Sequence, residues 1–253
     1  MPNLNSSILR NLPLQLPPLP EQKAIAEVLS SLDDKIDLLH RQNKTLEAMA
    51  ETLFRQWFVE EVEESWESGK LGDFANNIRV NIQPENIQPE THYIGLEHIA
   101  RKHIALNEYG FAQQIASNKS VFQKNDILFG KLRPYFHKVC FAPFDGVCST
   151  DILVLRPKES IYYPYCLFAL FQKEVVDYSD LSSEGTRMPR TSWEILQQFP
   201  IAIPSRETVL QFNEIAFPAI QKIEQNIDQI SKLTNLRDTL LPKLMSGEVE
   251  VES

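Results

Sequence analysis

The sequence predicts an α+β protein in which one globular, mostly-β domain is joined to two long helices that form an antiparallel coiled coil. Three observations predict it. A segment near the N-terminus recurs near the C-terminus, and each copy is followed by apolar residues at heptad spacing. Between the two copies the helical period fades, and short runs rich in Ile, Val, Phe and Tyr take its place.

Composition limits the class of protein before any motif is considered. The chain has 253 residues, 43% of them hydrophobic, which is enough for a packed core. It has no run of about 18 apolar residues, so we expect no membrane span. The three cysteines are odd in number and lack metal-ligand spacing, which favours reduced thiols in a cytoplasmic protein. A net charge of −9 argues against a non-specific polyanion binder, but a local basic patch can still bind DNA.

The repeat has a constant offset, since 188 − 1 = 187 and 204 − 17 = 187. It aligns MPNLNSSILRNLPLQLP with MPRTSWEILQQFPIAIP and continues without gaps into the following helices. The matched pairs include Met1 with Met188, Pro2 with Pro189, Ile8 with Ile195, Leu9 with Leu196, Pro13 with Pro200, Pro17 with Pro204, Ile36 with Ile223, Leu46 with Leu233, Thr52 with Thr239 and Leu53 with Leu240. We interpret residues 1–20 as the tail of a preceding repeat unit, so the chain looks like part of a two-unit protein.

The first long helix is expected within residues 21–62. Its apolar seam has alternating spacings of four and three residues, as in a coiled coil. Glycine and proline are absent from Glu21 to Val59. The seam is Ile25, Leu29, Leu32, Ile36, Leu39, Asn43, Leu46, Ala50, Leu53 and Trp57. A buried core helix is the alternative interpretation.

The second long helix is expected within residues 207–247 and is less regular. Its seam is Phe212, Ala216, Ala219, Ile223, Asn226, Ile230, Leu233, Arg237, Leu240 and Leu244. Pro218 should break or kink this helix near its start, because proline lacks an N–H and its ring clashes with the preceding turn. Pro242 and Gly247 are expected to mark its end.

Asn43 and Asn226 are the only asparagines on the two seams, and they predict a register. If they face each other in an antiparallel pair, contacting residues satisfy i + j = 269, since 43 + 226 = 269. Trp57 then lies near Phe212. A buried asparagine at such a position specifies register at a cost in stability. The alternative is that each asparagine points to water.

Apolar residues outside the seam are candidates for contact with partner proteins. They are Leu38, Met49, Phe54 and Phe58. Packing between the helices or against the middle domain is the alternative.

Residues 68–206 are predicted to form the globular domain. Strands are expected at HYIGL, DILFG, KVCFA and DILVLRP, which are bounded by Gly, Pro, Asn and Asp. One or two helices are expected, notably around Tyr163 to Val176. The domain is therefore α+β with a largely β core.

A cluster of polar residues in this domain is the candidate DNA-binding site. GKLRPYFHKV places its polar side chains at alternate positions, so an extended chain would put most of them on one face. Arg and Lys suit phosphates or guanine edges, and Tyr and His can stack or donate. GTRMPRTS adds basic residues on a loop, where Gly185 allows close approach, and CSTD adds small donors. The candidates are Lys131, Arg133, Tyr135, His137, Lys138, Ser149, Thr150, Thr186, Arg187 and Arg190. Each basic residue alone is equally explained as a solvated surface charge.

Taken together, these segments resemble the specificity (S) subunit of type I restriction–modification systems. The resemblance rests on LQLPPLPEQKAIAEVLSSLDDKIDLLHRQNKTLEAMAETLFRQWFVE, KLGDF, GKLRPYFHKV, STDILVLRP and GTRMP. It implies a target recognition domain that reads one half of a bipartite site in double-stranded DNA. It also implies helical spacers that scaffold methyltransferase (M) subunits, with a restriction (R) subunit joining through the complex. Catalysis would belong to those partners, and the resemblance implies no cofactor, no metal and no membrane.

The sequence departs from the family pattern in one respect. Two recognition domains and two spacers alternate in the family, whereas this chain has two spacers and one recognition domain. It therefore resembles a C-terminal half, which would need a second S chain, in a homodimer, to read a symmetric site.

Two other functions remain open. A metal-dependent nuclease would need carboxylates beside a lysine, for which Asp126 with Lys131, or Asp145 with Asp151, are the available sets. The sequence lacks a phosphate loop, an HExxH motif and zinc spacing, which disfavours other enzymes. A non-catalytic assembly or decoy protein, such as an inactive or antirestriction half-subunit, is the main alternative to a DNA reader.

Overall fold

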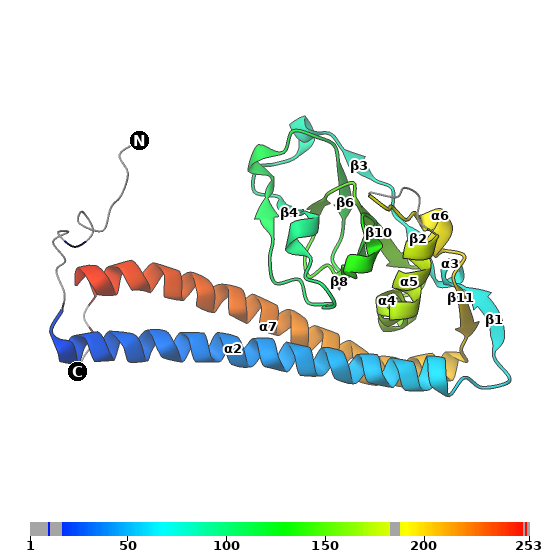
Figure 1. The fold of residues 1–253 in the computed structure, drawn as a ribbon, viewed down its shortest axis with the longest axis horizontal. Helices are drawn as coiled ribbons and strands as arrows, with labels where there is room; N and C mark the ends of the chain where they lie inside the picture. The colour runs from blue at the N-terminus through cyan, green and yellow to red at the C-terminus, as the bar shows by residue number, and fades with distance from the viewer. Residues whose placement is uncertain (1–9, 11–16, 183–187, 250, 252–253) are drawn as a thin grey trace. The chain divides into compact units, whose positions relative to one another are not determined.

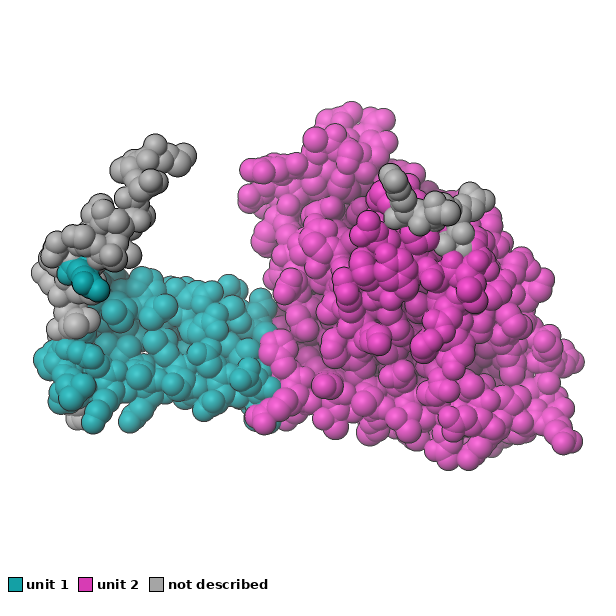
Figure 2. All heavy atoms as spheres, viewed as in Figure 1, with its two compact units in different colours: residues 1–39, 229–253 teal, residues 40–228 magenta. Residues whose placement is uncertain are grey.

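The computed structural model describes residues 10, 17–182, 188–249 and 251. They form two compact units, shown in different colours in Figure 2. The terminal unit comprises residues 1–39 and 229–253, and the central unit comprises residues 40–228. Each long helix begins in one unit and ends in the other.

The two predicted long helices are present. Helix α2 spans Leu19–Arg55, is extended by a π-helical turn at Gln56–Glu60, and begins beside Pro17 and Pro18. Helix α7 spans Arg206–Ser246. Figure 1 shows α2 in blue to cyan and α7 in orange to red, running in opposite directions.

Contacts in both units follow the predicted register. In the terminal unit, Ile36 and Leu39 pack against Ile230 and Leu233. In the central unit, the Asn226 Nδ2 atom donates a hydrogen bond of 2.8 Å to Asn43 Oδ1. Further along, the rings of Trp57 and Phe212 lie 6.2 Å apart. The antiparallel pairing with i + j = 269 is therefore confirmed.

The predicted break at Pro218 does not occur, whereas the helix does end beside Gly247 as expected. Helix α7 continues through both Pro218 and Pro242 and ends at Ser246, just before Gly247, whose φ is +74°. Pro218 is exposed, so water can reach the carbonyl that lacks a partner, and burial of Ala216 and Ala219 beside it offsets the lost hydrogen bond.

The middle of the chain folds into three small sheets. A two-stranded sheet pairs β1 with β11, a four-stranded sheet has the order β2-β10-β7-β8, and a five-stranded sheet has the order β3-β6-β9-β4-β5. The strands are β1 Glu67–Lys70, β2 Ala75–Asn77, β3 Asn81–Ile82, β4 His92–Ile94, β5 Gly110–Phe111, β6 Lys119–Phe122, β7 Ile127–Gly130, β8 Val139–Phe141, β9 Gly146–Cys148, β10 Ile152–Pro157 and β11 Pro200–Ile203. All pairs are antiparallel except β4 with β9. The four strands expected from the sequence are among them.

Short helices complete the globular part. They are α3 Leu71–Phe74, α4 Tyr163–Phe171, α5 Lys173–Leu181 and α6 Trp193–Leu196, with 3-10 turns at Pro84–Asn86, Leu96–His98, Ala112–Gln114, Pro134–Phe136 and Ser160–Tyr162. Of the one or two helices expected around Tyr163 to Val176, the structure has two. They divide at Gln172, whose extended backbone ends α4 and begins α5.

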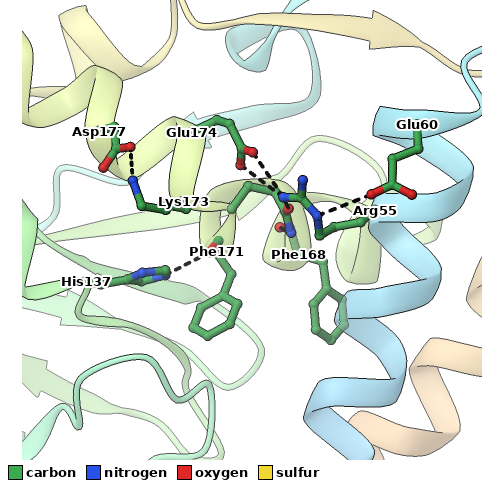
Figure 3. A network of polar contacts seen from close by, with 9 residues as sticks. Arg55, Glu60, His137, Phe168, Phe171, Lys173, Glu174 and Asp177 are labelled. Atoms are coloured by element: carbon green, nitrogen blue, oxygen red, sulfur yellow. Dashed lines mark hydrogen bonds and ion pairs between the residues drawn. The ribbon is translucent and has the colours of Figure 1, made fainter.

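The largest core joins the sheets to the long helices. Phe54 and Phe58 of α2 are 2% and 4% exposed and pack against Tyr165 of α4 and Phe212 of α7. Their role is packing within the chain, which was the alternative to partner contact. Arg55 reinforces this junction through hydrogen bonds to Gln172 and Glu174 (Figure 3).

The three cysteines are buried. Among the described residues, no helix combines the length and the apolar character needed to cross a membrane.

Candidate nucleic-acid interface

The segment from Gly130 to Lys138 is not the extended strand that the alternating pattern suggested. Strand β7 ends at Gly130, and Pro134–Phe136 form a 3-10 turn. Arg133 and His137, on either side of that turn, both have a φ of +51°, in the left-handed region. The polar residues of this segment therefore do not share one face.

Two of the candidates in this segment turn towards the protein. His137 is 7% exposed, and its Nε2 atom lies 2.8 Å from the Phe171 carbonyl oxygen (Figure 3). Burial lowers the pKa of His137. Lys138 is half-buried, its amine donates to the Leu96 carbonyl, and burial lowers its pKa as well. Both side chains hold the loop in place rather than presenting donors to solvent.

Tyr135 is the most exposed member of the segment, and Arg133 is half-buried. The Tyr135 ring is 49% exposed and lies 4.7 Å from the ring of Phe136. The Arg133 guanidinium lies 6.0 Å from the same Phe136 ring, and its Nε atom has no hydrogen-bond partner among the described residues. The Arg133 backbone N–H donates to the Pro189 carbonyl over 2.8 Å.

That backbone contact brings two predicted clusters together. Residues 189–191 run beside residues 131–133, with an antiparallel bridge between Leu132 and Arg190 and a 3.0 Å hydrogen bond from the Thr191 N–H to the Lys131 carbonyl. Lys131 and Arg190 are far apart in the sequence, yet both line one hollow of 340 Å³. Thr186 and Arg187, the other loop candidates, lie outside the described residues.

We call this feature the polar hollow. It opens where β2, β3, β6, β7 and β10 approach α6. Its polar lining consists of Asn77, Arg79, Asn81, Ser120, Lys131, Thr150, Arg190, Thr191, Ser192 and Glu194. Thr150 is exposed, whereas Ser149 uses its hydroxyl to accept a 3.2 Å hydrogen bond from the Asp151 N–H. Three of the predicted residues, Lys131, Thr150 and Arg190, therefore share one site.

Residues 77, 79 and 81 were missed by the sequence analysis. They alternate in NNIRVN, at the end of β2 and the start of β3, so the signal for one shared face was present. Neither β2 nor β3 has the run of apolar residues from which the other strands were predicted. Ser120 of β6 lies beside Asn81 through strand pairing, which is a non-local relation.

The polar hollow contains carboxylates as well as cations. Arg79 forms an ion pair with Glu194, and both side chains are about 60% exposed, at 63% and 60%. Arg190 lies 3.3 Å from Asp151. The pKa of Glu194 is lowered by the hydrogen bond from its own backbone N–H and by those from Arg79 and Ser192. Lys131 has no ion-pair partner among the described residues. The lining thus offers donors, acceptors and charges of both signs.

Asp126, one of the carboxylates considered for a nuclease, is engaged in structural hydrogen bonds. Asp126 is 1% exposed and accepts two hydrogen bonds from Arg156, of 2.6 and 2.8 Å. It also accepts a bond from the Gln123 N–H. Within the described ranges, no group of His, Cys, Asp or Glu side chains is arranged to hold a metal ion.

Comparisons with known proteins place the chain beside DNA specificity subunits. The family described as the type I restriction modification DNA specificity domain matches residues 1–48 and 63–239. The MjaIX specificity subunit of Methanocaldococcus jannaschii is 28% identical over 99% of this chain and 64% of its own length. The HindI specificity subunit of Haemophilus influenzae is 21% identical over 98% of this chain and 71% of its own.

A solved structure shares the fold. The S subunit of a type I restriction–modification system from M. genitalium matches with a TM-score of 0.59 and 20% identity, covering 89% of this chain and 61% of that one. The chain spans less than two thirds of both this structure and the MjaIX relative.

Proposed function

Because the chain belongs to the type I restriction–modification DNA specificity family, we propose that it reads one half of a bipartite DNA site through the polar hollow. The observation that carries the proposal is the convergence of Lys131, Thr150 and Arg190, from separate segments, on one site with Asn77 and Asn81.

The mixed charges of the hollow favour contact with bases over contact with phosphates. Asp151 and Glu194 would repel a phosphate, whereas a carboxylate accepts a hydrogen bond from the amino group of cytosine. Arginine and lysine pair with guanine edges, and asparagine pairs with adenine. The hollow therefore has the donor and acceptor variety that direct reading of base edges needs.

The proposed domain organisation places the recognition domain at residues 68–206, between spacers at residues 21–62 and 207–247, with residues 1–20 as the tail of a preceding unit. The bounds of α2 and α7 are compatible with these limits. The paired helices would scaffold two methyltransferase subunits, and a restriction subunit would join through that complex. Exposed Leu38 and Met49, at 40% and 41%, are suited to such contacts.

A second S chain would supply the other recognition domain. Positions 241 and 245 of α7 are the repeat equivalents, at offset 187, of the positions of Phe54 and Phe58 in α2. Phe54 and Phe58 are buried by the globular part of this chain, whereas Leu241 and Met245 are 45% and 49% exposed. No described residue covers Leu241 and Met245 as the globular part covers Phe54 and Phe58, which favours a second copy of the recognition domain.

Selection from a random duplex library tests the proposal. We expect the purified chain, with its methyltransferase subunits, to enrich a defined sequence. Arg190→Ala and Asn81→Ala should each relax the preference at particular base pairs, by roughly 1–3 kcal/mol per lost bidentate contact. Lys222→Ala, at an exposed position of α7, is the control and should leave the enriched sequence unchanged.

The decoy alternative gives a different result. An assembly or decoy protein would bind the methyltransferase subunits yet enrich no sequence, and the Arg190 and Asn81 variants would behave like the unaltered chain.

A further inference from the structure

A second cluster of cations lies in the central unit, apart from the residues that line the polar hollow. Helix α2 contributes Arg41 and Lys44, and the loop after the Leu96–His98 turn contributes Arg101, Lys102 and His103. We call these five residues the basic strip. Arg41, Lys44 and His103 line a shared hollow of 240 Å³, together with His40 and Asn107.

The loop is fixed to α2 by a buried carboxylate. Glu47 of α2 is 4% exposed, its Oε1 atom accepts a 2.7 Å hydrogen bond from the Ile104 N–H, and its Oε2 atom lies 3.3 Å from His103 Nδ1. Lys102 has a φ of +56°, and its N–H donates to the His137 carbonyl over 2.9 Å. These contacts hold three consecutive basic residues beside the helix.

The strip also continues towards the loop that carries Arg133. The Arg101 guanidinium lies 3.8 Å from the centre of the Phe136 ring, and Arg133 lies 6.0 Å from the same ring. Basic side chains therefore extend from α2 through Arg101 to Arg133, which lies two residues after Lys131 of the polar hollow.

The charge balance of the strip differs from that of the hollow. Arg41, Lys44, Arg101 and Lys102 are exposed and form no ion pair with any described residue, whereas Arg79 and Arg190 each pair with a carboxylate. Carboxylates near the strip include Glu47 and Glu51, and burial raises the pKa of both. Asp177 lines a hollow with Lys102, and Glu97 lies on the same side as Arg101. Four unpaired cations in a chain of net charge −9 form a local site for an anionic ligand.

We propose that the basic strip binds the phosphate backbone of the DNA whose bases the polar hollow reads. This inference rests on the proposed function and assigns the two clusters different tasks. The hollow discriminates between sequences, and the strip adds affinity that is the same for every sequence.

The test is the salt dependence of binding to two fluorescent 40-base-pair duplexes, one with the enriched site and one scrambled. The variants are Arg41→Gln with Lys44→Gln, and Arg101→Gln with Lys102→Asn, because asparagine tolerates the left-handed backbone at 102. Each double variant should reduce the slope of log K against log salt by about two, since one phosphate contact contributes about 0.9. The loss of affinity should be the same for both duplexes.

Lys222→Gln is the matched control. Lys222 is exposed on α7 two residues before Glu224, which pairs with Lys124 of the globular part, so it points about 160° away from that side. Circular dichroism of each variant checks that the fold is kept.

The outcomes separate the two proposals. If the strip variants match Lys222→Gln while Arg190→Ala loses sequence preference, the strip inference is wrong and the proposed function stands. If the strip variants reduce the slope but the unaltered chain prefers no sequence, the strip inference holds for DNA in general and the proposed function fails. Absence of DNA binding in every form of the complex would overturn both.

Discussion

At the scale of single residues, several polar side chains near the polar hollow make hydrogen bonds within the protein and do not line the hollow themselves. His137 is the clearest case, because the sequence places it within a basic segment and the structure directs its ring to the Phe171 carbonyl (Figure 3). Its left-handed backbone follows a turn that begins at Pro134. Alternation in the sequence does not reveal such a turn, since the pattern GKLRPYFHKV would look the same in an extended strand.

The buried imidazole predicts a pH-dependent stability. Burial lowers the pKa of folded His137 below its ordinary value of 6.5, so the unfolded chain binds the proton more readily. The stabilising contribution is therefore present above that value and is lost as the pH falls through it. We expect the urea midpoint of the unaltered chain to fall more between pH 8 and pH 5 than that of His137→Asn, in which asparagine tolerates the positive φ. Equal falls in both proteins would contradict this assignment.

At the scale of elements, the helices were predicted well because their signal is local. The heptad spacing of α2 and α7 defines which faces meet, and the two seam asparagines gave the register. The rule that proline breaks a helix considers only neighbouring residues and fails at Pro218. Packing around Ala216 and Ala219 keeps the helix continuous there. The polar hollow was predicted in part. Lys131, Thr150 and Arg190 have recognisable chemistry, but Asn77, Arg79 and Asn81 join them only through the pairing of short strands.

The asparagine pair provides a test at this scale. Asn43→Leu leaves Asn226 buried without its partner, which should cost about 1–3 kcal/mol of unfolding free energy. The double variant Asn43→Leu with Asn226→Leu should recover that loss or exceed the stability of the unaltered chain. Two leucines pack in the apolar heptad seam and leave no buried polar group without a partner. Urea denaturation of the unaltered chain, the single variant and the double variant measures both effects. A double variant less stable than the single variant would show that the pair is a net source of stability.

At the scale of the whole molecule, the helix pair has two similar ends and one recognition domain. Helical repeats at offset 187 make the ends equivalent in sequence, and Leu241 and Met245 are exposed with respect to the described residues. Composition and periodicity could suggest a half of a longer arrangement. They could not show which apolar side chains stay exposed, since that depends on the packing of Phe54 and Phe58 beneath α4.

Light scattering of the purified chain tests the second copy. We expect a mass of twice 29.1 kDa and an enriched DNA site with two-fold symmetry. Leu241→Glu with Met245→Glu should give a monomer, because charges at the apolar end oppose its burial. Leu210→Glu is the control, since Leu210 is 43% exposed on the same helix near its other end. A monomer before substitution, in the presence of methyltransferase subunits as well, would contradict the two-copy arrangement.

The way the polar hollow is built affects how its lining can change during evolution. Asn77 and Asn81 belong to short strands whose backbone hydrogen bonds are made within the sheets, whatever the side chains are. Substitutions at residues 77 and 81 therefore exchange one lining group for another without removing a backbone bond. If the polar hollow reads DNA as proposed, a lineage of such proteins can acquire a new target by a few substitutions while the surrounding fold is passed on unchanged.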